Sequence, residues 1–243
     1  MCLVLIAWRL HPRYALIVAA NRDEFYTRPT QPAQRWPGAS AMIGGRDLQA
    51  GGSWMGVDAR GRFAAVTNFR ELEQGPADAR SRGGLVTDYL LGDAPAENYL
   101  SELAERANHY RGYNLLLAEG GELYCASNRD LPIRHLQPGL HGVCNGPMDS
   151  DWPKVKRGRQ LLAEAVDRAE PNPEQLFELL CDQTQPADEA LPDDEIEAGA
   201  EAEVGAGADE EVAAEPEPAP TTIVRTTRAG EPKIGRASCR ERV

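Results

Sequence analysis

Paired apolar runs joined by short turns constrain the fold of this chain more than any other feature of its sequence. Leu3–Leu10 and Tyr14–Asn21 are two such runs, separated only by the turn sequence HPR. Ser53–Val57 and Arg62–Asn68 form a second pair around DARG, whose glycine suits the positive φ of a tight turn. Short turns of this kind join antiparallel strands, so each pair predicts a β-hairpin.

A third hairpin and four helices complete the pattern. The hairpin is expected over Asn114–Ala118 and Glu122–Ser127, with a further short strand at His141–Asn145. Helix-like patterns occur at Arg82–Leu91, from Pro95 onward, at Pro153–Arg168 and at Pro173–Cys181. Three of the four open with proline, which is favoured in the first turn of a helix. Hairpins interspersed with helices predict an α+β fold in which helices cover antiparallel sheets.

Composition excludes several classes of function. The net charge of −12 is concentrated between Asp188 and Glu217, which enclose thirteen acidic residues and no basic one. The rest of the chain is nearly neutral, which argues against a nucleic-acid binder that neutralises phosphates with a basic face. No run of eighteen apolar residues is present, so no membrane-spanning helix is expected.

The cysteines and histidines bear on metal binding and cellular compartment. The five cysteines are an odd number without metal-ligand spacing, which favours reduced thiols in a cytoplasm over a disulfide framework. The first residues lack the basic region and cleavage site of a secretory signal. The four histidines form no zinc-binding pattern. We therefore expect a cytoplasmic protein without a metal site.

The chain divides into four parts. Residues 1–183 are expected to form one main domain. Residues 184–220 contain no aromatic side chain and too little apolar surface to order, so they predict a disordered acidic linker. Residues 221–233 include TTIVRTT, a strand expected to return to the main domain. Residues 234–243 resemble the translation of a sequencing adapter, so we interpret them as an artefact and expect the native C-terminal part to be missing.

Cys2 is the first candidate for chemistry. Removal of the initiator methionine would expose a thiol and a free α-amino group on this one residue. The amine has an ordinary pKa of about 7.7–8.0, so it can act as a base near neutral pH. A thiol next to its own base is the arrangement of an N-terminal nucleophile. The alternative interpretation is a small apolar residue that begins a strand.

Polar residues follow the second strand, and a hairpin brings the end of that strand close to the start of the first. Asn21, Arg22 and Asp23 are therefore expected near Cys2. An arginine can lower the pKa of a thiol, and an aspartate can orient an α-amino group. The alternative is a salt-bridge cluster on the surface.

Four further residues are candidates for a site. Asn145, in VCNGP, ends a short strand, and its amide can donate to a developing oxyanion. Asn68, in VTNFR, faces the same choice between this role and an Asx turn. Trp54 either walls an apolar pocket or covers the core, and Arg46 can pair with a carboxylate or phosphate of a ligand.

Several sequence blocks resemble the NRDE family, also called transport and Golgi organisation 2. The two most specific blocks are ANRDEF at Ala20–Phe25 and AGGSWMGV at Ala50–Val57. Further agreement follows in the order of the family at Thr67–Glu71, Ser81–Val86, Tyr113–Leu117, Ser127–Arg129 and Trp152–Gly158. The resemblance covers the chain from Met1 to about Asp182.

The resemblance implies a four-layer αββα sandwich of two antiparallel sheets, as in the N-terminal nucleophile hydrolases. It also implies kinship with cysteine amidases such as bile-salt hydrolases and penicillin V acylases. The nucleophile, the strand-end aspartate and the oxyanion asparagine of those amidases match Cys2, Asp23 and Asn145. One arginine of the amidases has no counterpart, because its place holds Ala20, with Arg22 nearby.

Two functions follow from this resemblance. The family is associated with haem trafficking and with lipid and acyl-CoA homeostasis, which favours a carrier of a hydrophobic anionic ligand. The ligand-binding residues of such a carrier are expected to be Asn21, Arg22, Arg46, Trp54 and Asn68. The alternative is an amide hydrolase that cleaves C–N bonds with Cys2 as nucleophile. No cofactor is required in either case, haem and acyl-CoA are candidate ligands, and nucleic acid is not expected as a partner.

Overall fold

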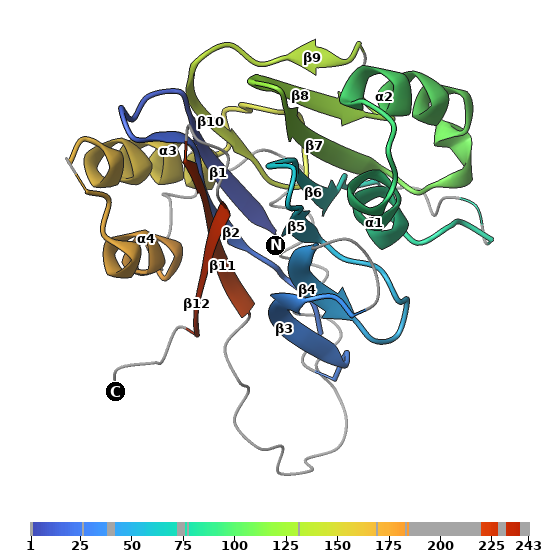
Figure 1. The fold of residues 1–243 in the computed structure, drawn as a ribbon, viewed down its shortest axis with the longest axis horizontal. Helices are drawn as coiled ribbons and strands as arrows, with labels where there is room; N and C mark the ends of the chain where they lie inside the picture. Colours follow the sequence, from blue (N-terminus) through green and yellow to red (C-terminus); the bar gives the residue numbers. More distant parts are fainter. Residues whose placement is uncertain are drawn as a thin grey trace, which may run out of the picture.

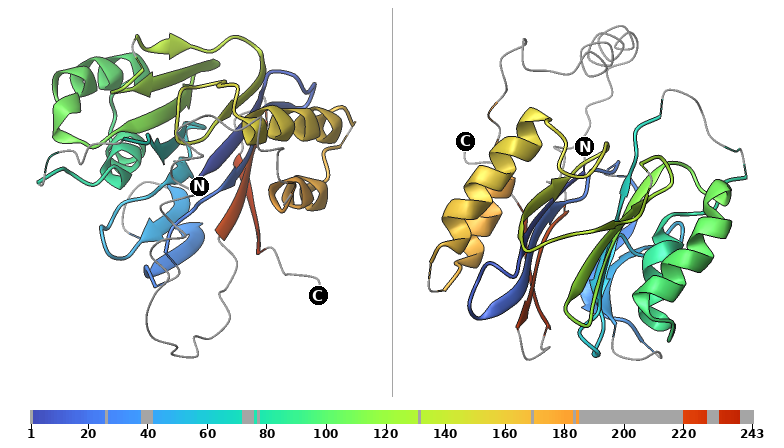
Figure 2. Two further views of the ribbon diagram at one scale, coloured as in Figure 1. Left: turned by 180° about the vertical axis from the view of Figure 1, so that it is seen from behind. Right: turned by 90° about the horizontal axis from the view of Figure 1, so that it is seen from above.

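Two antiparallel sheets face each other, and each carries helices on its outer side (Figure 1). The computed structural model describes residues 2–25, 27–37, 42–71, 76, 78–130, 132–168, 170–182 and 184, and the backbone of strands at 220–227 and 232–238. The right-hand view of Figure 2 shows the four layers side by side: helices, sheet, sheet, helices. The expected α+β sandwich is confirmed.

The first sheet has five strands in the order β10-β1-β2-β11-β12. Its members are β10 (Gly139–Val143), β1 (Leu3–Trp8), β2 (Tyr14–Asn21), β11 (Pro220–Thr227) and β12 (Pro232–Ser238). The hairpin of β1 and β2 forms the centre of this sheet, as its short turn predicts. The strand expected at TTIVRTT lies within β11, which pairs with β2.

The second sheet has seven strands in sequence order, from β3 to β9. They are β3 (Thr30–Arg35), β4 (Ile43–Asp47), β5 (Met55–Val57), β6 (Phe63–Asn68), β7 (Tyr113–Glu119), β8 (Glu122–Ser127) and β9 (Arg134–His135). The predicted β5–β6 and β7–β8 hairpins are confirmed. The sequence did not predict β3, β4 or β9, because β3 and β9 are largely polar edge strands and β4 contains two glycines.

Four α-helices in the described part of the chain form the outer layers. Helices α1 (Gly83–Leu91) and α2 (Ala96–Glu105) cover the seven-stranded sheet, and the 3₁₀ turn η1 (Ala107–His109) follows them. Helices α3 (Pro153–Val166) and α4 (Pro173–Leu180) cover the five-stranded sheet. None of these helices has the length and apolarity needed to cross a bilayer.

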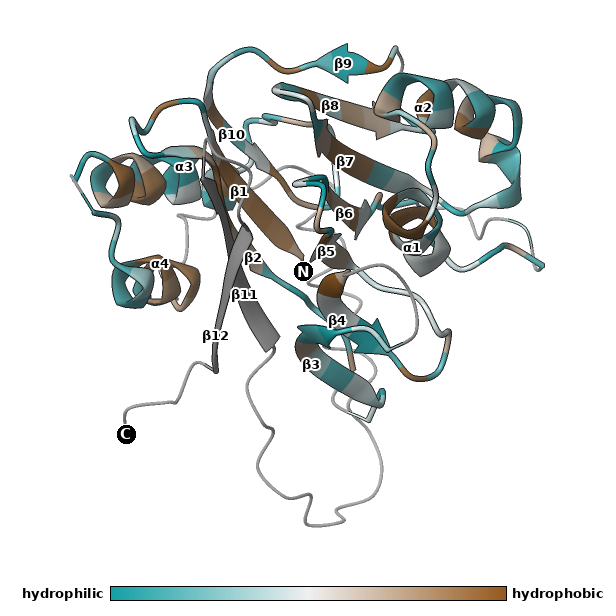
Figure 3. Cartoon of the chain, viewed as in Figure 1, coloured by the Kyte–Doolittle hydropathy of each residue, from teal (hydrophilic) through white to brown (hydrophobic). Residues whose placement is uncertain are grey.

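The alternation of side chains along β1 explains why its whole sequence is apolar. Val4, Ile6 and Trp8 point into the core between the two sheets, whereas Leu5 and Ala7 point toward α3 and α4. A strand buried on both faces needs apolar residues at every position, and Figure 3 shows β1 and β7 as mostly hydrophobic.

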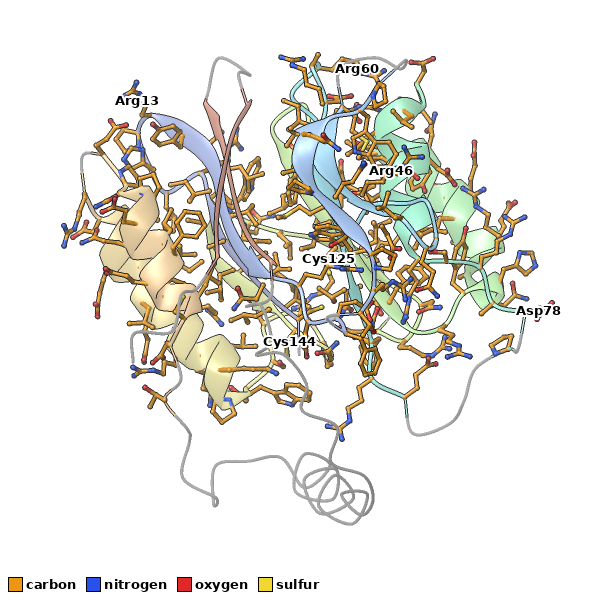
Figure 4. All side chains as sticks on the ribbon, turned by 90° about the horizontal axis from the view of Figure 1, so that it is seen from below. Arg13, Arg46, Arg60, Asp78, Cys125 and Cys144 are labelled. Atoms are coloured by element: carbon orange, nitrogen blue, oxygen red, sulfur yellow. The ribbon has the colours of Figure 1, made fainter. Side chains whose placement is uncertain are left out.

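Cysteines occupy different environments in the sandwich. Cys125 is buried in the core between the sheets, where Figure 4 labels it, and Cys144 is buried after β10. Both are free thiols, as is Cys2, but Cys181 is disulfide-bonded. The expectation of reduced thiols throughout was therefore wrong at Cys181. An odd number of cysteines excludes complete pairing, but it does not exclude one pair.

The expected linker and artefact fall partly outside the described residues. From the acidic segment predicted at 184–220, the structure describes residue 184 and the first residue of β11. Backbone of the adapter-like segment from Ile234 to Ser238 lies within β12, which pairs with β11. Strand pairing uses backbone groups that every non-proline residue carries, so an adapter-like sequence can also take part in it.

Candidate functional site

The β1–β2 hairpin places Cys2 beside the polar residues that follow β2. Leu3 pairs with Asn21 in the antiparallel register of the hairpin. Cys2, which precedes Leu3, and Asp23, which follows Asn21 by two residues, therefore lie at the same end of the hairpin. There the backbone N–H of Asp23 donates to Cys2 Sγ at 3.5 Å. The thiol is partly buried and the Asp23 side chain is exposed. The predicted proximity of these residues is therefore present in the structure.

A cleft of about 390 Å³ opens in front of the Cys2 thiol. Its walls come from the ends of β1, β2, β4 and β6, from the start of α1 and from the loops beside them. The residues that line it are Cys2, Arg22, Asp23, Glu24, Arg28, Asp47, Ala50, Ser53, Trp54, Val66, Asn68, Ala79, Arg80, Ser81, Arg82, Gly83 and Arg111. Five arginines face three carboxylates, so the lining carries two more positive charges than negative ones.

Asp47 organises one wall of the cleft. Its carboxylate accepts hydrogen bonds from Arg28 Nε at 2.8 Å and from Arg22 Nη2 at 3.2 Å. It also accepts from the backbone N–H groups of Gln49 and Ala50, each at 3.0 Å. Burial raises the pKa of this carboxyl, but these hydrogen bonds outweigh burial and hold the pKa of Asp47 below its ordinary value. The carboxylate therefore stays ionised and positions both guanidinium groups.

Arg22 also covers an aromatic ring. Its guanidinium lies 4.4 Å from the ring centroid of Trp54, within the range of a cation–π contact. The same ring lies against Gly45, where an added Cβ would be 2.3 Å from the indole. Trp54 is therefore held between β4 and Arg22 as part of the cleft wall.

Glycines join the loop before β5 to the start of α1. An added Cβ on Gly52 would lie 2.4 Å from the carbonyl carbon of Gly83, and the N–H of Ser53 donates to the Gly83 carbonyl at 3.2 Å. This backbone contact brings two sequence blocks of the family resemblance together. It also fixes the N-terminal end of α1 at the cleft.

The opposite wall carries three arginines from two segments. The N–H of Arg80 donates to the His109 carbonyl at 2.9 Å, and Arg82 Nη1 donates to the Gly112 carbonyl at 3.0 Å. These contacts bring Arg80 and Arg82 next to the loop that carries Arg111. The three side chains have no carboxylate within ion-pair distance among the residues that the structure describes.

The environment of Cys2 disfavours its thiolate on balance. Burial raises the pKa of the thiol, and the positive charges of Arg22 and Arg82 lower it without cancelling the effect of burial. The thiol is thus protonated at neutral pH in this arrangement. A base next to the sulfur is required before Cys2 can act as a nucleophile.

The predicted oxyanion asparagine is engaged elsewhere. Nδ2 of Asn145 donates to the Asn68 carbonyl at 3.0 Å, while its Oδ1 is buried without a hydrogen-bond partner in the described part of the chain. Behind it, Thr67 Oγ1 donates to the Cys144 carbonyl at 2.8 Å and accepts from Asn114 Nδ2 at 3.2 Å. The role of Asn145 toward an oxyanion stays a prediction, whereas Asn68 itself lines the cleft.

Two of the predicted ligand-binding residues point away from the cleft. Arg46 precedes Asp47 on β4, and strand alternation turns it to the opposite face, where it stacks over Trp36 at 4.9 Å. Asn21 lies on the helix-facing side of β2, and its Nδ2 donates to the Leu180 carbonyl at 2.8 Å. Both side chains join elements of the fold together.

Sequence reasoning missed much of the cleft, including Arg28, Asp47, Arg80, Arg82 and Arg111. The signal available for two of these was the RSRGG block, in which arginines flank the start of a helix. Arg28 and Arg111 lie in loops and Asp47 ends the unpredicted strand β4, so the positions of all three depend on tertiary contacts. Within the described ranges, no group of three His, Cys, Asp or Glu side chains is arranged to hold a metal ion.

The family profile and three individual relatives that match this sequence all belong to one family. The profile of the family described as Transport and Golgi organisation 2 matches residues 1–206. Transport and Golgi organization 2 homologs of Mus musculus and Homo sapiens are each 36% identical over 211 residues, covering 81% of this chain and 76% of theirs. Transport and Golgi organization protein 2 of Drosophila melanogaster is 31% identical over 217 residues, with coverage of 81% and 76%.

Comparison with solved structures gives an acylase, a hydrolase and an amidase of similar fold. Penicillin V acylase from Agrobacterium tumefaciens superposes with a TM-score of 0.54 at 11% identity, over 98% of this chain and 86% of that one. The C2A mutant of conjugated bile acid hydrolase from Clostridium perfringens gives 0.51 at 10% identity, over 98% and 92%. The Caenorhabditis elegans ortholog of N-acylethanolamine-hydrolyzing acid amidase gives 0.51 at 12% identity, over 76% and 87%. At these identities the similarity establishes the fold.

Proposed function

This chain belongs to the Transport and Golgi organisation 2 family, and from that premise we propose that it binds a hydrophobic anionic ligand in the Cys2 cleft. The proposed role is in haem trafficking or in lipid and acyl-CoA homeostasis, as the resemblance of the sequence to the NRDE family suggests. Haem and an acyl-CoA are the candidate ligands, because each combines an apolar body with carboxylate or phosphate groups.

The excess of arginine over carboxylate in the cleft is the observation that carries this proposal. A concave site with two uncompensated positive charges attracts an anion, and guanidinium groups match the geometry of carboxylates and phosphates. Trp54 and Val66 supply apolar surface in the same cleft. Its volume of about 390 Å³ also lies within the range of small-molecule sites.

Direct titration tests the proposal. We expect haemin or palmitoyl-CoA to bind the purified chain, and we expect Arg22→Gln to weaken that binding by about tenfold or more, because it removes a charge at the Trp54 wall. Arg35→Gln is the matched control, since Arg35 is an exposed arginine on β3 that does not line the cleft. Absence of binding by both ligands, or equal affinity in the native and Arg22→Gln chains, would reject the proposal.

Contact between Cys2 and Asp23 favours a second candidate function, a cysteine amide hydrolase. In this mechanism the Cys2 sulfur attacks an amide carbonyl, and the α-amino group exposed by loss of Met1 takes the thiol proton. The C–N bond breaks, the amine leaves with that proton, and water then hydrolyses the thioester to a carboxylic acid and a free thiol. The solved structures of similar fold include an acylase, a hydrolase and an amidase.

Binding is the preferred function for two reasons. The pKa of the Cys2 thiol lies above its ordinary value, and Asn145 is hydrogen-bonded to Asn68. Acyl transfer therefore needs a base to take the thiol proton, and only the second N–H of the Asn145 amide is left for an oxyanion. We also propose a cytoplasmic setting, because Cys2, Cys125 and Cys144 are free thiols.

A further inference from the structure

The charges of the Cys2 cleft fall into two separate groups. On one wall Arg22 and Arg28 face Asp47 and Glu24, with nitrogen–oxygen distances between 2.8 and 3.6 Å. On the other wall, Arg80, Arg82 and Arg111 line the cleft without a carboxylate in ion-pair contact in the described ranges. The excess positive charge of the lining therefore lies on the second wall, which carries three arginines.

Backbone contacts hold this second wall in place before any ligand binds. Arg80 forms an isolated parallel bridge with Tyr110, and its N–H donates to the His109 carbonyl. Arg82 donates to the Gly112 carbonyl, and the Gly112 N–H in turn donates to Glu71 at 2.7 Å. Little conformational entropy of the backbone is left to lose on binding, which favours tight recognition.

Carboxylates compensate the charge of Arg82 only in part. Burial lowers the pKa of the Arg82 guanidinium, and the positive charge of Arg111 lowers it further. Glu71 and Glu24 raise the pKa of this guanidinium, but the pKa stays below its ordinary value. Arginines that repel one another are stabilised by an anion placed between them, and a dianion compensates them better than a monoanion does.

We propose that Arg80, Arg82 and Arg111 form a subsite for a dianionic phosphate group, such as a phosphomonoester or a diphosphate end. This inference rests on the proposed function, because it names the polar end of the ligand that the cleft binds. Ser81 and Gly83, at the start of the nine-residue helix α1, line the same wall, and the positive end of the helix dipole adds to the attraction. Arg22 and Arg28 do not belong to the subsite, because Asp47 already compensates them.

A pair of probes that differ in charge tests the subsite. Phenyl phosphate and benzoate share an aromatic ring, but at pH 7.5 the first is a dianion and the second a monoanion. By calorimetry we expect phenyl phosphate to bind about tenfold or more tightly than benzoate. We expect the double substitution Arg80→Gln and Arg111→Gln to remove this preference, and Arg35→Gln to leave it intact. Arg80 and Arg111 are exposed, so the double variant is expected to fold.

The charge of the probe itself supplies a second readout. The second pKa of a phosphate monoester is about 6, so at pH 5 the probe is largely monoanionic and its advantage over benzoate should shrink. Equal affinity for the two probes at pH 7.5, or a preference that survives the double substitution, would overturn the subsite.

Vesicles distinguish the source of the phosphate. Sedimentation with phosphatidylcholine vesicles that contain phosphatidic acid, lost in the double variant, assigns the group to a lipid headgroup. Binding of phenyl phosphate without such sedimentation assigns the phosphate group to a soluble ester.

The same measurements distinguish failure of the proposed function from failure of the subsite. If haemin and palmitoyl-CoA do not bind but the phosphate preference is present, only the ligand proposal is rejected. If haemin binds through Arg22 and the preference is absent, only the subsite is rejected.

Discussion

The backbone N–H of Asp23 donates to the sulfur of Cys2 at 3.5 Å, across 21 residues of chain. This contact exists because the β1–β2 hairpin returns the end of β2 to the start of β1. A thiol is thereby held in the lining of an arginine-rich cleft. An anion bound in this cleft and an acyl group attached to this sulfur would make different demands on the same residues.

Cys2→Ser should separate binding from catalysis. A hydroxyl is a much weaker nucleophile than a thiol but nearly the same size, so hydrolysis of an acyl amide should disappear. Affinity for haemin or palmitoyl-CoA should change by less than about threefold, since neither ligand depends on the sulfur in the carrier role. Calorimetry and release of amine from an acyl amide, both on protein whose N-terminal peptide has been mapped, measure the two effects. Loss of both activities together would contradict the carrier interpretation.

Arg22→Gln should destabilise the fold as well as weaken binding. Arg22 is 9% exposed and donates to Asp47, so its loss removes one charged hydrogen bond from a buried carboxylate. We expect a loss of about 2 kcal/mol in the free energy of unfolding, at the lower end of the range for such bonds because Arg28 remains. Urea unfolding measures this, with Arg35→Gln as the control. An unchanged midpoint would show that Arg28 and the backbone satisfy Asp47 alone.

Gly52→Ala should displace the start of α1. Its Cβ would meet the backbone of Gly83 at 2.4 Å, and a backbone cannot move aside as a side chain can. We expect a destabilisation of about 1–3 kcal/mol, as for other overpacked sites, together with weaker ligand binding. Gly84→Ala is the matched control, since its Cβ has no neighbour nearer than 3.9 Å and alanine favours a helix. Equal thermal stability of the two variants would contradict this interpretation.

Unfolding free energy should depend on pH through His141 and Asp149. Nδ1 of His141 lies 2.8 Å from the Asp149 carboxylate, and its Nε2 lies 2.8 Å from the Gln137 carbonyl. Burial lowers the pKa of His141, but these two contacts outweigh it and the pKa is raised. Burial raises the pKa of Asp149, but the bond to His141 outweighs it and the pKa is lowered.

The signs of these two shifts define a pH window. The contribution of His141 is complete below its ordinary pKa of about 6.5 and is lost as pH rises through the raised value. The contribution of Asp149 is complete above its ordinary pKa of about 3.9 and is lost as pH falls through the lowered value. The stability difference between the native chain and His141→Gln should therefore be larger at pH 5.5 than at pH 9, with His109→Gln as the control. A difference that does not vary with pH would exclude the ion pair.

Arg82→Gln should make the Cys2 thiol less reactive. The positive charge of Arg82 lowers the pKa of the thiol, so its removal should raise that pKa further and slow alkylation by iodoacetamide at pH 8. Peptide mapping assigns the modified residue, because Cys125 and Cys144 are buried. An alkylation profile that matches that of Arg35→Gln would show that the charge of Arg82 does not reach the sulfur.

Local sequence patterns were sufficient for the main elements. Apolar runs separated by tight turns predicted the hairpins of β1–β2, β5–β6 and β7–β8, and prolines marked the starts of α3 and α4. The hairpin also predicted that Arg22 and Asp23 lie near Cys2, because the register of a hairpin depends only on its turn. The polar edge strand β3 and the glycine-containing inner strand β4 carry no such pattern and were missed.

The sequence by itself determined the three hairpins and the position of Cys2 at a strand start, because both depend on local periodicity and on short turns, whereas the four-layer sandwich was implied by the family resemblance. Only the tertiary structure decided which charges meet that thiol. The side chain of Asp47 points into the cleft and that of Arg46 points away from it, because adjacent residues on a strand face opposite sides of the sheet. The strand that carries both residues, β4, was itself not predicted. Arg82 and Arg111 line the same cleft because the Arg80 N–H donates to the His109 carbonyl and Arg82 Nη1 donates to the Gly112 carbonyl, long-range contacts that no spacing along the chain encodes.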